Sequence, residues 1–368
     1  MPKQNHGPEA SAGSELVTRH SSLVTQSATH RAAVLYGHRD IRIEDRPTPV
    51  IGPDAVLLRV RACTICGSDL HYYDHGMRAP APIVIGHEFA GEVVALGEHV
   101  HGFEVGARVA VEPGVSCGTC EQCQHGYPNL CPHVRFCSTP PVDGAIQEFM
   151  AFPAHALFAL PPELSFIDGA MLEPLCIAIK ALDFGKLRVG ETAAVIGGGA
   201  IGLLIIQLLR AAGATAIYAT DRLAYRREAA IRAGATATLD PADPVRDLIE
   251  RTGGRGVDVA FEAASSSSTP QQAVEMARIG GRVVLVGIQP DDHVVLHTSH
   301  LRRKAITITP VRRAAHVYPR ALALVQRGLV QLDWLVTHRF PLEQTAAAFA
   351  LAADYADGAL RVAVTLDD

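Results

Sequence analysis

Short apolar runs alternate with helical patterns from residue 191 to about residue 287, and this alternation restricts the fold more than any other feature of the sequence. Runs typical of strands occur at 193–197, 216–220, 257–261 and 282–287, with helical patterns at 200–212 and 224–234. Strands that alternate with helices form a parallel sheet with helices on its faces. The pattern therefore predicts a doubly wound α/β domain in this part of the chain.

The first part of the chain has a different pattern. From Ala33 to about Val111, short runs alternate apolar and polar residues and are broken by Gly and Pro. This is typical of short antiparallel strands in a barrel-like domain. After about Pro310 mixed patterns return, and the run 360–366 suits a last strand that is added back to this domain. The length of 368 residues agrees with two domains, since a domain typically has about 150 residues.

A glycine motif follows the first strand of the α/β region. Gly197, Gly199 and Gly202 fit the pattern Gly-x-Gly-x-x-Gly between a strand and a helix. In that context the glycines permit a tight turn, a close approach of the backbone to a pyrophosphate, and close packing of the helix on the strand. The free N–H groups at the helix N-terminus favour the negative phosphates. The motif predicts a dinucleotide-binding site.

Asp221 ends the second strand of this region, nineteen residues after Gly202, where a carboxylate can accept hydrogen bonds from a ribose 2′-hydroxyl. Because a carboxylate repels a 2′-phosphate, the sequence favours NAD over NADP. Arg222, Arg226 and Arg227 follow closely, and an arginine that neutralises the phosphate would oppose this preference. A second interpretation of Asp221 is a cap for the helix that starts near residue 224.

Four cysteines, Cys117, Cys120, Cys123 and Cys131, are separated by two, two and seven intervening residues. This spacing is typical of a closed zinc site with four thiolate ligands, which stabilises a lobe and leaves the metal no open position for chemistry. The alternative is a disulfide cluster, which is disfavoured because no export signal is visible and a chain of this size seldom needs such cross-links.

A mixed group of metal-binding residue types comes from separated segments: Cys66, His87, Glu88 and, much later, Glu173. One thiolate, one imidazole and one or two carboxylates resemble the ligands of a catalytic zinc with an open position for a substrate oxygen. A zinc ion lowers the pKa of a bound hydroxyl, so an alcohol could lose its proton near neutral pH and then expel a hydride. Taken singly, these residues have other interpretations. Cys66 could be a small residue of the hydrophobic core, and His87 and Glu88 could be a buried polar pair that satisfies its own hydrogen bonds.

The proton of such an alcohol must leave a closed site. Ser68 lies beside a predicted ligand, and His71 follows three residues later, on the same face if this turn is helical. These two residues could pass the proton to solvent, and we expect them, together with Glu173, to act in catalysis.

Composition excludes several classes of function. A hydrophobic content of 48%, a charged content of 19% and a net charge of −5 give no basic excess, so we expect no nucleic-acid partner. The most apolar stretch, 201–212, is shorter than the roughly 20 residues that a bilayer span needs, so we expect no membrane insertion. Residues 1–30 are rich in polar residues without an apolar run, which predicts a flexible extension rather than a signal peptide and indicates a cytoplasmic protein.

These motifs together resemble a known family. Cys66-Gly-Ser-Asp, Gly-His-Glu at 86–88, the four cysteines, Glu173-Pro and the glycine motif follow one another in the order found in zinc-dependent medium-chain dehydrogenases, from about residue 31 onward. Within them the sequence looks most like the sorbitol and xylitol (polyol) dehydrogenases. The segments that support this narrower resemblance are Leu70-His71-Tyr72, 136–144, 173–175 and 336–342.

The resemblance implies a GroES-like catalytic domain at 31–174 and 311–368, a Rossmann NAD-binding domain at 175–310, and a homotetramer. It implies that Cys66, His87 and Glu88 hold the catalytic zinc, with Glu173 bound through a water or in exchange. Substrate contacts would come from Tyr72, Glu173 and Arg312. The implied cofactor contacts are Gly197, Gly199, Ile201, Gly202, Asp221, Arg226, Val286, Gly287, Ile288 and Arg312.

One segment departs from the family. Where the family commonly reads Phe-Arg-Tyr, this chain has Val311-Arg312-Arg313, which removes two aromatic faces and adds a charge. The preferred polyol, and whether it carries a carboxylate or phosphate, stay open. We expect an NAD-dependent zinc enzyme that oxidises a secondary hydroxyl of a small polyol to a ketose. The alternatives are a threonine or other secondary-alcohol dehydrogenase and a nucleotide-sensing protein without turnover, which retention of the catalytic ligands disfavours.

Overall fold

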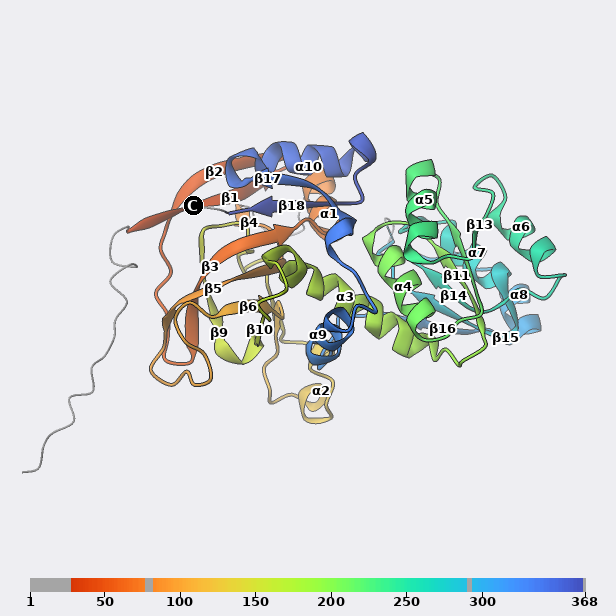
Figure 1. Cartoon of the computed structure of the whole chain (residues 1–368), viewed down its shortest axis with the longest axis horizontal. Helices are drawn as coiled ribbons and strands as arrows, with labels where there is room; N and C mark the ends of the chain where they lie inside the picture. The colour runs from red at the N-terminus through yellow and green to blue at the C-terminus, as the bar shows by residue number, and fades with distance from the viewer. Residues whose placement is uncertain (1–27, 77–81, 290–292, 367–368) are drawn as a thin grey trace, which may run out of the picture.

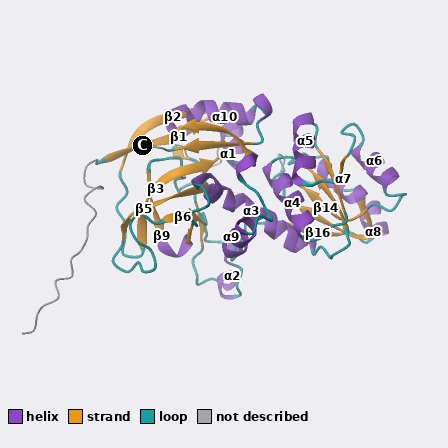
Figure 2. Ribbon diagram, viewed as in Figure 1, coloured by secondary structure: helices purple, strands orange, loops and turns teal. Residues whose placement is uncertain are grey.

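Two lobes of different construction make up the protein, and the long helix α3 (Phe166–Gly185) lies between them (Figure 1). The computed structural model describes residues 28–76, 82–289 and 293–366. One lobe consists mainly of strands, whereas the other has helices around a sheet (Figure 2). Both predicted fold types, a GroES-like domain and a Rossmann-type α/β domain, are confirmed by this architecture.

The first lobe contains a three-stranded sheet in the order β2-β1-β4 and a seven-stranded sheet in the order β10-β6-β5-β3-β18-β17, with β9 also pairing with β3. Their bounds are β1 (Thr29–Gly37), β2 (Asp40–Pro47), β3 (Ala55–Thr64), β4 (Ile83–Val84), β5 (Glu88–Leu96), β6 (Arg108–Val111), β9 (Phe149–Pro153), β10 (Leu157–Ala159), β17 (Val336–Pro341) and β18 (Arg361–Thr365). Strand β18 runs antiparallel to β3, as the return of the chain to this lobe predicts.

Shorter elements complete this lobe and the connection to the second. They are α1 (Gly67–His75), β7 (Gly114–Val115), α2 (Glu121–Gln124), β8 (Arg135–Phe136), α9 (Tyr318–Gln326) and α10 (Thr345–Ala353). Cys66 is the N-cap residue of α1, and its backbone N–H donates to the carboxylate of Asp69, an arrangement that satisfies a free donor at the start of a helix.

The second lobe contains a six-stranded parallel sheet in the order β13-β12-β11-β14-β15-β16. Its elements are β11 (Thr192–Ile196), α4 (Ala200–Ala211), β12 (Ala216–Thr220), α5 (Ala224–Ala233), β13 (Ala237–Thr238), α6 (Pro244–Arg251), β14 (Val257–Glu262), α7 (Thr269–Met276), β15 (Ala277–Leu285), α8 (Thr298–Lys304) and β16 (Thr307–Pro310). Every residue of β14 is buried, as expected of a central parallel strand covered on both faces. The strand order reverses between β11 and β14, which is where doubly wound sheets bind ligands.

Helix α3 connects the two hydrophobic cores. Ser165 caps its first turn, since its hydroxyl accepts from the N–H of Asp168 at 3.0 Å. The helix packs against β5 of the first lobe and α4 of the second. It continues through Pro174, so the domain boundary expected between residues 174 and 175 falls inside a single helix.

The start of the chain also differs from expectation. Strand β1 begins at Thr29, which pairs with Pro47 of β2. Thr29 and His30, which the prediction assigned to the extension of residues 1–30, therefore belong to the sheet. Residues 1–27 lie outside the described residues. Within the three described ranges, no helix is both long enough and apolar enough to cross a membrane.

Candidate active site and metal centres

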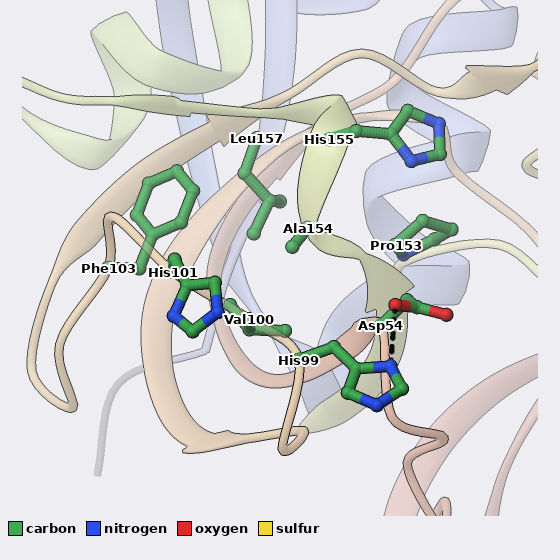
Figure 3. A pocket seen from close by; sticks show the side chains of 9 residues that line it. All are labelled: Asp54, His99, Val100, His101, Phe103, Pro153, Ala154, His155 and Leu157. Atoms are coloured by element: carbon green, nitrogen blue, oxygen red, sulfur yellow. Dashed lines mark hydrogen bonds and ion pairs between the residues drawn. The ribbon is translucent and has the colours of Figure 1, made fainter.

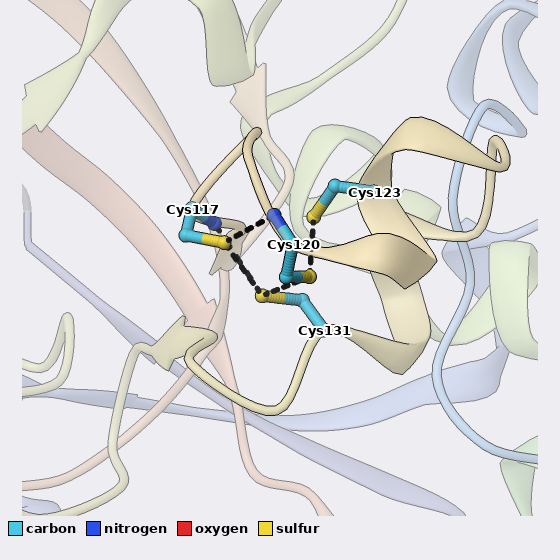
Figure 4. A group of neighbouring side chains, drawn as sticks. All are labelled: Cys117, Cys120, Cys123 and Cys131. Carbon is cyan, nitrogen blue, oxygen red and sulfur yellow. Dashed lines mark hydrogen bonds between the residues drawn. The ribbon is translucent and has the colours of Figure 1, made fainter.

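The four cysteines of the loop that carries α2 point their sulfur atoms toward one another (Figure 4). The Sγ–Sγ separations are 3.4 Å for Cys120–Cys123, 3.8 Å for Cys120–Cys131 and 3.5 Å for Cys117–Cys131. A tetrahedron of thiolates around zinc has edges of about 3.8 Å, whereas a disulfide is about 2.05 Å long. The cysteines are free thiols. The geometry therefore fits a four-thiolate zinc site and does not support the disulfide alternative.

Removal of one thiolate from this lobe should lower stability more than chemistry. Cys123→Ser replaces a zinc ligand by a hydroxyl, which binds zinc poorly, so the lobe loses the free energy of metal binding. We expect about one zinc fewer per chain by elemental analysis and a lower melting temperature, with dinucleotide binding retained. Gln122→Ala, on the same short helix, is the control and should keep both zinc ions. An unchanged zinc content in Cys123→Ser would contradict the assignment.

The predicted catalytic ligands meet between α1 and β5. One ligand atom from each of Cys66, His87 and Glu88 lies within 4.8 Å of the others. Cys66 precedes α1, and His87 and Glu88 stand where β5 begins. Gly86, just before them, has φ +94°, and a Cβ there would lie 2.7 Å from the Sγ of Cys63. Only glycine fits this approach, which turns the imidazole toward Cys66.

Asp69 holds two of these ligands in place, and sequence reasoning gave it no role. One carboxylate oxygen accepts from the backbone N–H of Cys66 at 3.0 Å. The other lies 3.2 Å from Nδ1 of His87 and accepts from the hydroxyl of Ser138 at 3.0 Å. A carboxylate at Nδ1 fixes the imidazole so that Nε2 remains for a metal. The signal in the sequence was its position three residues after Cys66, at the third residue of the helix.

Arg361 was also missed. It lies in β18 and is buried, and its guanidinium donates to Glu88 at 3.0 Å and to the carbonyl of Ile65 at 2.6 Å. Thr64 donates to the second oxygen of Glu88. A buried carboxylate needs such partners, because an unpaired charge in a protein interior is costly. One arginine in an otherwise apolar strand was the available signal.

Glu173 lies on α3 beside the tight ligand set but outside it. Its side chain is buried, and burial raises the pKa of its carboxyl to about 7, with the charge of Glu88 acting in the same direction. A divalent cation nearby would lower that pKa and favour the carboxylate. This position of Glu173 is compatible with the expectation that it binds the catalytic zinc through a water molecule or in exchange with another ligand.

Helix α1 presents the three other residues expected near the reaction. Ser68 and Tyr72 are partly buried, whereas His71 is exposed and its ring centroid lies 4.9 Å from that of His75. Because this turn is helical, Ser68 and His71 lie on the same face of α1. The proton route from Ser68 through His71 to solvent required this turn to be helical, and the turn is helical.

The glycine motif lies at the reversal of strand order in the second lobe. Gly197 has φ +103°, and a Cβ there would lie 2.7 Å from the carbonyl of Ala263, which follows β14. A Cβ on Gly202 would lie 1.8 Å from the carbonyl oxygen of Gly197. In contrast, a Cβ on Gly199 would meet no described protein atom closer than 4.0 Å. The first and third glycines thus close the turn, and the second leaves room at the N-terminus of α4.

Asp221 accepts two backbone hydrogen bonds at this turn. One oxygen accepts from the N–H of Gly198 and the other from that of Leu223, each at 2.8 Å. The second bond holds Leu223, the N-cap residue of α5, so Asp221 supports the approach to this helix but does not cap it. Arg226 lies 3.9 Å from Asp221 and stacks 4.8 Å from the ring centroid of Tyr355. Among the described residues its buried Nε has no hydrogen-bond partner, which fits a site that is completed by a polar ligand.

The remaining cofactor candidates lie after β15 and along α4. The N–H groups of Val286 and Gly287 donate to the carbonyl of Glu262 at 2.8 and 3.1 Å. Ile288 is 65% exposed, and Ile201 packs on the core of the second lobe. Arg312 is exposed, and its carbonyl accepts from the side chain of Asn129 at 2.9 Å. The adjacent Arg313, and not Arg312, stacks on an aromatic ring of the first lobe.

Cys63, Cys137 and Cys176, which lack a predicted role, are all buried in the interior, as expected of small apolar residues.

A cavity of about 780 Å³ opens at the far end of the first lobe (Figure 3). It borders residues 99–103, which follow the end of β5. Glu88 is the first of the nine residues of that strand, so the length of β5, roughly 30 Å, lies between Glu88 and the cavity. Its polar groups include Asp54 and His99, which lie 3.2 Å apart. None of the predicted site residues lines it, so the proposed chemistry does not involve this cavity.

Comparison with known proteins defines the class. Models of the alcohol dehydrogenase GroES-like domain and of the zinc-binding dehydrogenase match residues 52–162 and 200–327. The chain belongs to the zinc-dependent medium-chain dehydrogenases, and it is an oxidoreductase that uses zinc and a nicotinamide dinucleotide.

Individual relatives narrow the comparison. Sorbitol dehydrogenase from Bacillus subtilis (strain 168) is 39% identical over 340 residues, which cover 91% of this chain and 96% of the relative. (R,R)-Butanediol dehydrogenase from the same organism is 37% identical over 85% of this chain and 93% of its own length. The crystal structure of a zinc-binding dehydrogenase from Sinorhizobium meliloti 1021 bound to NADP has a TM-score of 0.85 and 33% identity, covering 92% of this chain and all of that one.

Proposed function

We propose that this enzyme oxidises a secondary hydroxyl of a small polyol to a ketone, with NAD as the hydride acceptor. The observation that carries the proposal is the convergence of Cys66, His87 and Glu88, with the buried Glu173 beside them. The names of the relatives, sorbitol and butanediol dehydrogenases, support a substrate with more than one hydroxyl. They also favour a polyol over threonine.

The chain's own residues have separable tasks in this reaction. When bound, zinc supplies a Lewis acid that lowers the pKa of an alcohol, and the nicotinamide accepts the hydride. Asp69 orients His87, while Arg361 balances the charge of Glu88. Ser68 and the exposed His71 carry the released proton along α1 to solvent.

Tyr72 and Glu173 are proposed to bind the hydroxyl next to the reacting one. A site that hydrogen-bonds this second hydroxyl leaves its own polar groups unpaired when a simple alcohol binds. Sorbitol or xylitol should therefore exceed 2-propanol in kcat/KM by about a hundredfold or more. The test is a panel of polyols, 2-propanol and threonine with NAD and with NADP, followed by the absorbance of the reduced nicotinamide. Equal activity on 2-propanol, or a preference for threonine, would refute the substrate assignment.

Asp221 is proposed to select the coenzyme. Asp221→Ala should weaken NAD binding by about 1 to 3 kcal/mol and narrow its advantage over NADP, because a charge-assisted hydrogen bond to the ribose is lost and the repulsion of a 2′-phosphate is relieved. Titration with NADH and NADPH measures both affinities. Asp221→Asn removes the charge but keeps only one of the two backbone hydrogen bonds to Gly198 and Leu223, because an amide nitrogen cannot accept. Glu228→Ala, on the exposed face of α5, is the control. A wild-type enzyme that prefers NADP would overturn the assignment.

The same proposal includes a cytoplasmic homotetramer with catalytic residues 31–174 and 311–368 and cofactor-binding residues 175–310. Free cysteines and the thiolate site support a reducing compartment. Strand β16 forms an edge of the parallel sheet and offers unpaired backbone groups to a second copy. Analytical ultracentrifugation measures the assembly directly.

A further inference from the structure

Arg313 stands between the two metal centres, in the segment after β16. Its backbone has φ +52°, a left-handed conformation that a residue other than glycine rarely adopts. Its Cζ lies 4.6 Å from the ring centroid of Phe136. The ring of Phe136 in turn lies 5.4 Å, centroid to centroid, from that of the zinc ligand His87. The ring of Phe136 is thus a neighbour of both the guanidinium of Arg313 and the predicted zinc ligand His87.

The guanidinium is partly buried without a counter-charge. In the part of the chain that the structure describes, no carboxylate pairs with Arg313, and the groups that act on its charge are Arg312, Tyr72 and Cys131. Burial lowers its pKa to about 10, so it stays charged at neutral pH. Arg282, which is similarly sheltered, pairs with Glu191, and the buried Arg361 pairs with Glu88.

Two carboxylates of the active site, Glu88 and Asp69, are already engaged by other groups. Glu88 is held by Arg361 and Thr64, and Asp69 by the Cys66 backbone, His87 and Ser138. A partly desolvated guanidinium without an anion is costly, and its flat face already rests on an aromatic ring. Its N–H edge therefore remains for an acceptor that comes with the ligand.

We propose that Arg313 binds an anionic group, a carboxylate or a phosphate, at the end of the substrate chain remote from the reacting hydroxyl. This inference rests on the proposed function, because it assigns the second end of the same substrate. The two ring separations of 5.4 and 4.6 Å keep the guanidinium within about 10 Å of His87. A sugar acid or a polyol phosphate can span that distance with its reacting carbon at the metal and its anion at Arg313. The planar fork of arginine binds either anion through two parallel hydrogen bonds.

The experiment compares sorbitol, sorbitol 6-phosphate and gluconate as substrates with NAD. At least one anionic compound should exceed sorbitol in kcat/KM, and its advantage should decrease as salt increases, because ions screen the attraction. Arg313→Gln should lower kcat/KM for that compound by about 10- to 100-fold more than for sorbitol, as expected for a lost charged hydrogen bond. Arg313→Lys, which keeps the charge but not the fork, should recover part of the loss. The compound that is preferred decides between phosphate and carboxylate.

Arg135→Gln is the matched control, because Arg135 precedes Phe136, is exposed, and carries the same charge. It should not alter the preference. Calorimetric titration of each anionic compound into wild type and Arg313→Gln measures binding without turnover. The anion site would be refuted if sorbitol were the best substrate, or if wild type and Arg313→Gln bound the anionic compounds equally well. Either result would leave the assignment of a polyol substrate intact. If no compound reduces NAD but Arg313→Gln weakens anion binding, the proposed function fails and the anion site stands.

Discussion

Cys66→Ser is expected to abolish turnover while leaving dinucleotide binding nearly intact. The serine hydroxyl is of similar size to the thiol but is a poor zinc ligand, so the set formed with His87 and Glu88 loses its only thiolate. A metal that stabilises a developing oxyanion contributes several kcal/mol, so kcat should fall by about a thousandfold or more. Elemental analysis measures the loss of zinc, steady-state kinetics the fall in kcat, and titration with NADH the retained binding of the dinucleotide.

Cys123→Ser provides the comparison for this prediction, because it removes a thiolate from the other centre. Its main effect is expected on stability, whereas Cys66→Ser should melt close to wild type. Wild-type protein without zinc, or Cys66→Ser with a nearly normal kcat, would show that the ligand set does not carry the chemistry.

A second large effect is expected from two glycines that are only three residues apart. Gly202→Ala places a methyl group 1.8 Å from the carbonyl oxygen of Gly197. Because that oxygen belongs to the backbone directly after β11 and cannot swing aside like a flexible side chain, α4 must move off the turn. Overpacking of this severity should cost about 3 kcal/mol or more and produce little folded protein. Thermal melting and the yield of soluble protein measure this loss.

Gly199→Ala should give the opposite result. Its backbone has φ −74°, which alanine adopts readily, and the added methyl group meets no described atom closer than 4.0 Å. The variant should therefore melt like wild type, yet its methyl group occupies the space needed by the pyrophosphate, so NADH should bind at least about tenfold more weakly. Normal NADH binding by Gly199→Ala would mean that the phosphates do not lie at this turn.

The parts of the fold that were predictable from sequence depend on local patterns. The parallel sheet follows from the spacing of apolar runs, and the glycine motif gains its meaning from the strand before it and the helix after it. The boundary that the resemblance implies between residues 174 and 175 corresponds to no local break, since α3 runs through Pro174 although proline disfavours a helix interior. In the structure the helix continues, because its sides are buried against both lobes and this packing outweighs the lost hydrogen bond.

The supporting residues of the active site were less accessible to sequence reasoning. Asp69 acts on His87, 18 residues later, and Arg361 acts on Glu88 across 273 residues. No short pattern contains both members of such pairs, so only the folded chain reveals them. Likewise, the stacking of Arg313 on Phe136 accompanies a left-handed backbone conformation at Arg313 that no local pattern in the sequence indicates.

The pairing of Arg361 with Glu88 also sets an order of events during synthesis. A ribosome makes Cys66, His87 and Glu88 early, but the positive charge that balances Glu88 is added 273 residues later. Until β18 joins β3, the nascent first lobe lacks both a sheet strand and that counter-charge. We therefore expect the metal centre to reach its final form late, after the complete dinucleotide-binding lobe has been synthesised.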